Sequence, residues 1–169
     1  MCSSDLEDDD FDDEDADEEG PSQTERLATL VKLLASVDLT LPPTFLTFMG
    51  DVEMQLAVPS GTACEWDLSE RLIESPFEDD AFLICFLRDQ QDCRFWYLCI
   101  GRSSTCILYS PVPYDDPELD ETPEALMKHT FWVAPHFEHF VYRFWMENVL
   151  WELLADGSSL TPEIGRAHV

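Results

Sequence analysis

Two histidines and a glutamate near the end of the chain have the side chains of a metal or acid–base site. His136, Glu138 and His139 lie within four consecutive residues, and on a helix the side chains at 136 and 139 share a face. Imidazole and carboxylate groups bind zinc, but a protein zinc site takes at least three ligands. No cysteine stands at a metal-finger spacing from this group. We therefore expect surface histidines with no bound metal or other cofactor, and keep a metal site or an enzyme built on these residues as an alternative.

Six cysteines supply the other candidate reactive groups. Most of them lie in apolar runs and no export signal precedes them, so reduced thiols in the core are predicted. Cys93 differs, because Asp92 and Arg94 flank it beside a predicted turn, and it is expected to be exposed and oxidisable but not catalytic. The sequence also has no phosphate-binding glycine loop, no G-x-S-x-G and no H-E-x-x-H motif. No enzymatic activity is predicted.

Two clusters of carboxylates are the candidate partner-binding groups. The first cluster precedes a predicted buried strand, and the second lies in a proline-rich loop between Pro111 and Pro123, the kind of exposed loop that often carries function. The first comprises Glu74, Glu78, Asp79 and Asp80, and the second comprises Asp115, Asp116, Glu118, Asp120 and Glu121. These side chains either solvate two loops or face one basic partner, and we take the second as the working hypothesis.

Three helices are predicted to frame the sheet that positions these groups. Ser22 and Glu25 fit a capping box, and apolar residues at helical spacing follow, so the first helix is expected over residues 23–37. Pro43 fits the first turn of a short second helix. A wide apolar stripe predicts the last helix over 135–156, where an Asp-Gly pair closes it.

The strands are predicted from their apolar patterns. Alternating apolar residues over 52–58 predict a half-buried strand, and runs at 81–87, 94–100 and 105–109 predict an antiparallel meander. Continuous apolar runs indicate that the central strands are covered on both faces, and the flanking helices are expected to cover them. The predicted fold is α+β, with a central antiparallel sheet of about 4–6 strands flanked by N-terminal and C-terminal helices.

Composition divides the chain into three parts. Residues 1–21 are predicted to be a disordered acidic tail, since 12 of the 15 positions from Asp5 to Glu19 are Asp or Glu. Residues 22–164 are long enough for one domain with one core, and 165–169 form a C-terminal tail. The longest apolar run has seven residues, and the first twenty residues do not resemble a signal peptide, so a cytoplasmic protein without a membrane span is predicted.

The net charge of −27 narrows the class of partner. The part outside the acidic tail still carries −15, which disfavours nucleic acid and anionic membranes. A basic protein is the expected partner, because opposite charge speeds the encounter, although acidity that serves only solubility is an alternative. The oligomeric state is not predicted.

Two motifs in the predicted order of elements resemble the SUKH superfamily. Leu41-Pro-Pro-Thr-Phe-Leu-Thr-Phe48 is similar to the "Leu-Pro, aromatic, aromatic" second helix of that family, and Ala134-Pro-His-Phe-Glu-His-Phe140 to its "Ser-Phe-Glu-Glu-Phe" helix. The segment from Phe140 to Asn148, with Trp151, is similar to the ending of many bacterial members, and the resemblance covers roughly residues 24–164. The Asn-Gly that often follows the second helix in the family is replaced here by Met-Gly-Asp.

This resemblance implies a non-catalytic, protein-binding function. Many bacterial SUKH domains are immunity proteins that bind and block a toxin, often a nuclease, which presents a basic surface to hold phosphates. The expected function is therefore an immunity protein that neutralises a cognate toxin by covering a basic surface. A regulatory or adaptor module of the same fold is the alternative.

Overall fold

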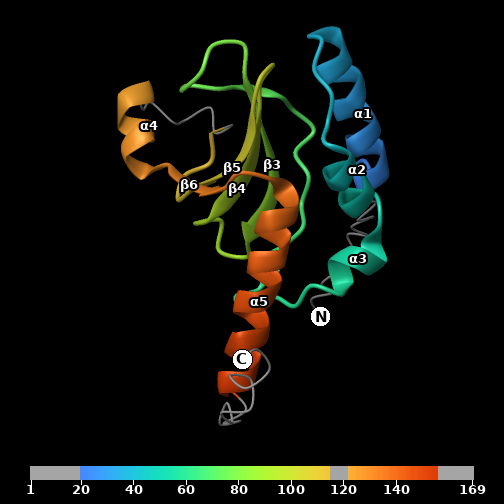
Figure 1. Cartoon of the computed structure of the whole chain (residues 1–169), viewed down its shortest axis with the longest axis vertical. Coiled ribbons are helices and arrows are strands. Elements are labelled where there is room, and N and C mark those ends of the chain that lie inside the picture. The colour runs from blue at the N-terminus through green and yellow to red at the C-terminus, as the bar shows by residue number, and fades with distance from the viewer. Residues whose placement is uncertain (1–19, 115–121, 156–169) are drawn as a thin grey trace, which may run out of the picture.

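The computed structural model describes residues 20–114 and 122–155, as a six-stranded antiparallel sheet with helices before and after it (Figure 1). The mixed α+β class, the number of strands and the flanking helices are confirmed. The helices are α1 (Gln23–Ser36), α2 (Pro43–Met49), α3 (Val52–Leu56), α4 (Pro123–His129) and α5 (Phe137–Ala155). The strands are β1 (Cys64–Glu65), β2 (Ile73–Glu74), β3 (Phe82–Asp89), β4 (Phe95–Ile100), β5 (Thr105–Ser110) and β6 (Phe131–Ala134).

The first two helices start where their capping residues predict. The Glu25 carboxylate accepts a hydrogen bond from the Ser22 backbone N–H at 2.9 Å, and the Ser22 hydroxyl accepts one from the Glu25 backbone N–H at 3.4 Å. These are the two bonds of the capping box. Pro43 occupies the first turn of α2, where its missing N–H costs nothing. The capping-box and proline predictions are confirmed.

The strand predicted over 52–58 is wrong, because this segment contains helix α3. The Asp51 carboxylate accepts hydrogen bonds from the backbone N–H groups of Glu53 at 3.0 Å and Met54 at 3.2 Å, which caps the helix. The amide of Gln55 is buried and donates to the backbone carbonyls of α2, so the polar residue faces inward. The alternating apolar residues are exposed instead: Val52 (62%), Met54 (44%) and Leu56 (74%).

The sheet is built around the predicted meander of β3, β4 and β5. The strand order is β1-β3-β4-β5-β6, and β2 also pairs with β3. All of these pairings are antiparallel. The three strands of the meander are confirmed to within one or two residues of their predicted ends. The short strands β1, β2 and β6 and the helix α4 were not predicted.

The two faces of the sheet have different covers. Helices α1, α2 and α5 pack on one face, where the larger apolar cluster lies. The opposite face holds a smaller cluster with Leu83, Tyr97 and Cys99, and Phe77 and Tyr114 from the neighbouring loops pack against it. Burial of both faces is confirmed, but the expectation that the flanking helices cover both is wrong, because loop residues cover the second.

Phe86 lies at the centre of the larger cluster. It is fully buried where the register of β3 shifts, and its ring lies 5.8 Å from Phe45, 5.3 Å from Phe137 and 5.4 Å from Phe140. Trp66 stacks beside it at 6.3 Å. This aromatic cluster joins α2 and α5 to the sheet.

The remaining predictions about chain organisation fall partly outside the described residues. The last helix is confirmed from Phe137 to Ala155, while its predicted Asp-Gly end lies beyond the described part. The predicted tails at 1–21 and 165–169 and the domain boundary at 164 stay predictions. No helix within 20–114 and 122–155 is long and apolar enough to cross a bilayer.

Replacing Phe86 with alanine removes the ring that joins three elements of the core. We expect Phe86→Ala to lower the free energy of unfolding by about 3–5 kcal/mol, because a large cavity is left in the aromatic cluster. Leu56→Ala, at a side chain that is 74% exposed, is the control and should change it by less than about 0.5 kcal/mol. Chemical denaturation of both variants measures the difference. Equal effects would contradict the central position of Phe86.

Candidate protein-binding surface

An apolar groove lies where α2, α3 and α5 meet. It encloses about 530 Å³, and apart from two threonines and one glutamate its lining side chains are apolar. The apolar lining residues are Pro43, Phe48, Met54, Val58, Phe137, Val141, Tyr142 and Trp145. An open apolar surface of this kind on a folded domain is typical of a site that binds another protein.

The groove exists because α5 is apolar on more than one face. Phe137, Phe140 and Phe144 are buried on the sheet side, yet Tyr142 is 65% exposed and Trp145 is 38% exposed. A helix that only covered a core would carry polar residues at these positions. The wide apolar stripe was predicted, but its division into a buried face and an exposed face was not.

The charge in the groove is negative. Glu138 accepts a hydrogen bond from the Thr44 hydroxyl at 3.1 Å, and the pKa of its carboxyl lies below its ordinary value. The main cause is the hydrogen bond from its own backbone N–H, to which Thr44 and the neighbouring His136 and His139 add. Glu138 is therefore ionised at neutral pH, and no lysine or arginine of the described part of the chain lines the groove.

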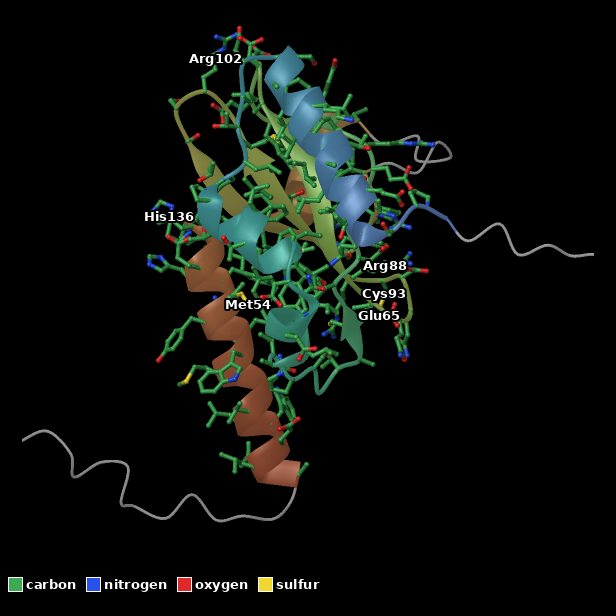
Figure 2. All side chains as sticks on the ribbon, turned by 90° about the vertical axis from the view of Figure 1, so that its right-hand side faces the viewer. Met54, Glu65, Arg88, Cys93, Arg102 and His136 are labelled. Carbon is green, nitrogen blue, oxygen red and sulfur yellow. The ribbon has the colours of Figure 1, made fainter. Side chains whose placement is uncertain are left out.

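The two histidines lie at the start of α5, next to this groove. His136 and His139 are exposed, as predicted for surface histidines, with their rings 5.4 Å apart. Figure 2 shows His136 at the surface. Within the described residues there is no group of three or more histidine, cysteine or acidic side chains placed to hold a metal ion. His136 and His139 therefore lie beside the groove, without a third ligand among the described residues, and the alternative of a metal site stays untested.

The first acidic cluster is exposed at another part of the surface. Its members Glu74, Glu78, Asp79 and Asp80 lie in β2 and in the connection to β3, and all four are exposed. The Glu78 carboxylate lies close to Gly101 in the turn between β4 and β5. Arg102, the next residue of this turn, is at the top of Figure 2, far from Met54 in the groove. The four carboxylates thus form an acidic surface separate from the groove.

The second acidic cluster lies outside the described residues. It comprises Asp115, Asp116, Glu118, Asp120 and Glu121. Tyr114, the last described residue before it, contacts Phe77 in the connection that carries the first cluster, with ring centroids 5.9 Å apart. Tyr114 therefore lies beside the connection that carries the first cluster. The prediction that both clusters face one partner stays a prediction.

The cysteines within the described residues are thiols, mostly in the core. Cys64, Cys85 and Cys99 are buried, and Cys106, opposite Cys99 in the sheet, is half-buried. The hydrogen bond with Cys106, followed by burial, raises the pKa of Cys99. These positions agree with the prediction of core thiols, and Cys2 lies outside the described residues.

Cys93 is exposed as predicted, but its surroundings oppose reactivity. Its thiol donates a hydrogen bond to the Asp89 carboxylate at 3.1 Å, and this bond raises the pKa of the thiol above its ordinary value. Asp89 is buried and also accepts the backbone N–H groups of Cys93 at 2.9 Å and Arg94 at 3.1 Å. These bonds outweigh the effect of burial and lower the pKa of Asp89. The predicted exposure of Cys93 is confirmed, and its oxidation stays a prediction, against which the raised pKa of the thiol acts.

Comparison with known proteins gives no relative. No family model, no curated protein and no solved structure matches this chain. The resemblance to the SUKH superfamily and everything that it implies therefore stay predictions.

Removing the negative charge of Asp89 should make the Cys93 thiol more reactive. At a pH below its raised pKa the thiol is protonated and slow to react, so Asp89→Asn is expected to lower the pKa and speed alkylation by iodoacetamide at pH 8. Mass spectrometry of the peptide that contains residue 93 measures the rate. Cys93→Ser is the control that reports reaction of the buried thiols. An unchanged rate in Asp89→Asn would contradict the assigned effect of the carboxylate.

Proposed function

We propose that this chain is a non-catalytic protein-binding domain that holds a basic amphipathic helix of a partner protein in the groove between α2, α3 and α5. This proposal rests on an apolar groove in which the ionised carboxylate of Glu138 is the only charged lining group among the described residues. Binding an amphipathic helix in an apolar groove is a common mode of peptide recognition.

The spacing of the lining residues on α5 fits a helical partner. Glu138, Val141, Tyr142 and Trp145 stand at i, i+3, i+4 and i+7, so they form one straight stripe along two turns. Met54 on α3 lines the same groove. An apolar stripe of the same spacing on a partner helix would meet this surface along its length.

Charge supports a basic rather than an acidic partner. The chain carries −15 outside its acidic tail, and Asp51, the N-cap of α3, and Glu53, in its first turn, are close in sequence to Met54. Lysine or arginine residues that flank the apolar stripe of a partner helix would be attracted to this rim. Nucleic acid and anionic membranes would be repelled by the same charge.

Toxin neutralisation is the form of this function that the SUKH resemblance implies. The exposed acidic surface of Glu74, Glu78, Asp79 and Asp80 supports it, because these carboxylates could cover a basic, phosphate-binding site while the groove provides apolar contact. The partner would be met in the cytoplasm, which agrees with the predicted reduced thiols.

A regulatory or adaptor module is the second candidate. It is favoured by the apolar character of the groove, since burial of apolar area supplies affinity without blocking an active site. The two functions differ in a measurable way: an immunity protein abolishes the activity of its partner when it binds, and an adaptor leaves that activity intact.

Two designed peptides test the charge and shape of the partner. Both have the same helical apolar stripe, with lysine and arginine on the polar face of one and glutamate on that of the other. The full chain should bind the basic peptide at least about tenfold more tightly at low salt, and added salt should reduce this difference. Fluorescence anisotropy measures both affinities. Equal binding, or tighter binding of the acidic peptide, would contradict the proposal.

A pair of methionines locates the binding site. Met54 lines the groove and is 44% exposed, whereas Met127 on α4 is 57% exposed and lies outside it. Met54→Gln should weaken binding of the basic peptide by roughly tenfold through lost apolar contact, and Met127→Gln should leave it unchanged. Equal losses in the two variants would show that the groove is not the site.

A further inference from the structure

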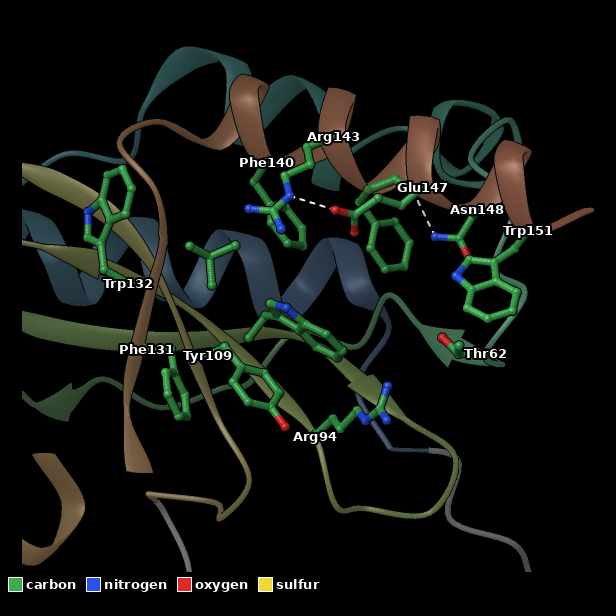
Figure 3. A pocket seen from close by; sticks show the side chains of 13 residues that line it. Thr62, Arg94, Tyr109, Phe131, Trp132, Phe140, Arg143, Glu147, Asn148 and Trp151 are labelled. Atoms are coloured by element: carbon green, nitrogen blue, oxygen red, sulfur yellow. Dashed lines mark hydrogen bonds and ion pairs between the residues drawn. The ribbon is translucent and has the colours of Figure 1, made fainter. Parts of the chain in front are cut away.

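A second cavity lies between α5 and the sheet, at strands β4, β5 and β6 (Figure 3). It encloses about 380 Å³, within the usual range for small-molecule sites. It is lined by other residues of α5 than those of the protein-binding groove, among them Phe140, Arg143 and Trp151. The two cavities are therefore separate candidate sites on one helix.

Aromatic rings form most of the wall. On the sheet side, Trp96 lies 5.5 Å from Tyr109, and Tyr109 lies 5.9 Å from Phe131. Phe140 faces Trp96 from α5 at 6.5 Å, and Trp151 is 64% exposed on the last part of the helix. Trp96 and Tyr109 are half-buried and Phe131 is exposed, so this sheet-side wall favours a ligand that is itself flat and aromatic.

Two arginines that differ in their ion pairing also line this cavity. Arg143 is bound to Glu147, with 2.7 Å between its Nε and the carboxylate oxygen, so its charge is neutralised within α5. Arg94, the residue just before β4, lines the cavity from the sheet side, and its positive charge helps to lower the pKa of the nearby Asp89. Its guanidinium takes part in none of the ion pairs between described residues. Figure 3 shows Arg94 and Tyr109 on the sheet side of the cavity and Arg143 and Glu147 on the helix side.

The end of the cavity is fixed by a buried amide. Asn148 is only 4% exposed, its Oδ1 accepts the backbone N–H of Gly61 at 2.6 Å, and its Nδ2 donates to the Phe144 carbonyl at 2.8 Å. These bonds hold the chain beside Thr62 against α5. The wall is thus held in place before any ligand arrives, which reduces the ordering cost of binding.

We propose that this cavity binds a small aromatic monocarboxylate, with its ring against the aromatic wall on the sheet side and its carboxylate on Arg94. An arginine and a carboxylate form a charge-assisted, bidentate pair. A single negative charge suits the site, because the lining has one positive charge in excess, from Arg94 and Arg143 against Glu147. The acidic surface of the rest of the chain disfavours polyanions such as nucleoside polyphosphates.

Calorimetric titration of the full chain with indole-3-acetate, phenylacetate and 2-naphthoate tests this proposal, with indole-3-acetamide and adenosine triphosphate as comparisons. At least one carboxylate should bind at millimolar concentration or below, and indole-3-acetate should bind about tenfold or more tightly than its neutral amide. No binding of any of the three carboxylates, equal binding of acid and amide, or tighter binding of the triphosphate would overturn the proposal.

Variants of two exposed arginines complete the test. Arg94→Gln should weaken carboxylate binding by roughly 10- to 100-fold, while Arg102→Gln, in the β4–β5 turn and outside the cavity, should leave it unchanged. An unchanged affinity in Arg94→Gln would overturn the assignment. Because Met54 and Arg94 line different cavities, loss of peptide binding and loss of carboxylate binding are distinguishable.

Discussion

The packing of α5 on the sheet is the contact on which the other features of this fold depend. One face of the helix carries Phe137, Phe140 and Phe144, and it joins β3 and β4 through Phe86 and Trp96. The C-terminal half of α5 extends beyond the sheet (Figure 1), and the helix is also apolar on the faces that the sheet does not cover. Each flank therefore forms part of a cavity, with α2 and α3 on one side and with β4 to β6 on the other.

The two cavities differ in the charge of their lining residues, and therefore in the kind of ligand that each would bind. The groove on the α2–α3 side has one ionised carboxylate and suits a cationic partner helix, while the cavity on the sheet side has an arginine without an ion-pair partner among the described residues. Both lie in a chain whose surface is strongly acidic. A basic protein is attracted over a long range by the whole surface, whereas a small monoanion would be held only by contacts at short range.

Local signals in the sequence predicted much of the fold and little of the site. The capping box at Ser22, the proline of α2 and the apolar runs of the meander act within a few residues, and the elements that they predict are confirmed. Residues 52–58 have the period of a strand, but the Asp51 cap and the buried Gln55 amide make a helix, and this depends on contacts with α2. The short strands and both cavities depend on residues distant in sequence, which no single-segment pattern contains.

Site-specific crosslinking in the cells that produce this protein identifies the segment that the groove between α2, α3 and α5 binds. A photoreactive residue is placed at position 54 in the groove, or at position 127 outside it, in the full chain, and crosslinked peptides are identified by mass spectrometry. We predict that position 54 captures a segment with a helical apolar stripe flanked by lysine and arginine, and that position 127 does not. Capture of the same segments from both positions, or of an acidic segment at position 54, would contradict the proposed binding of a basic partner helix.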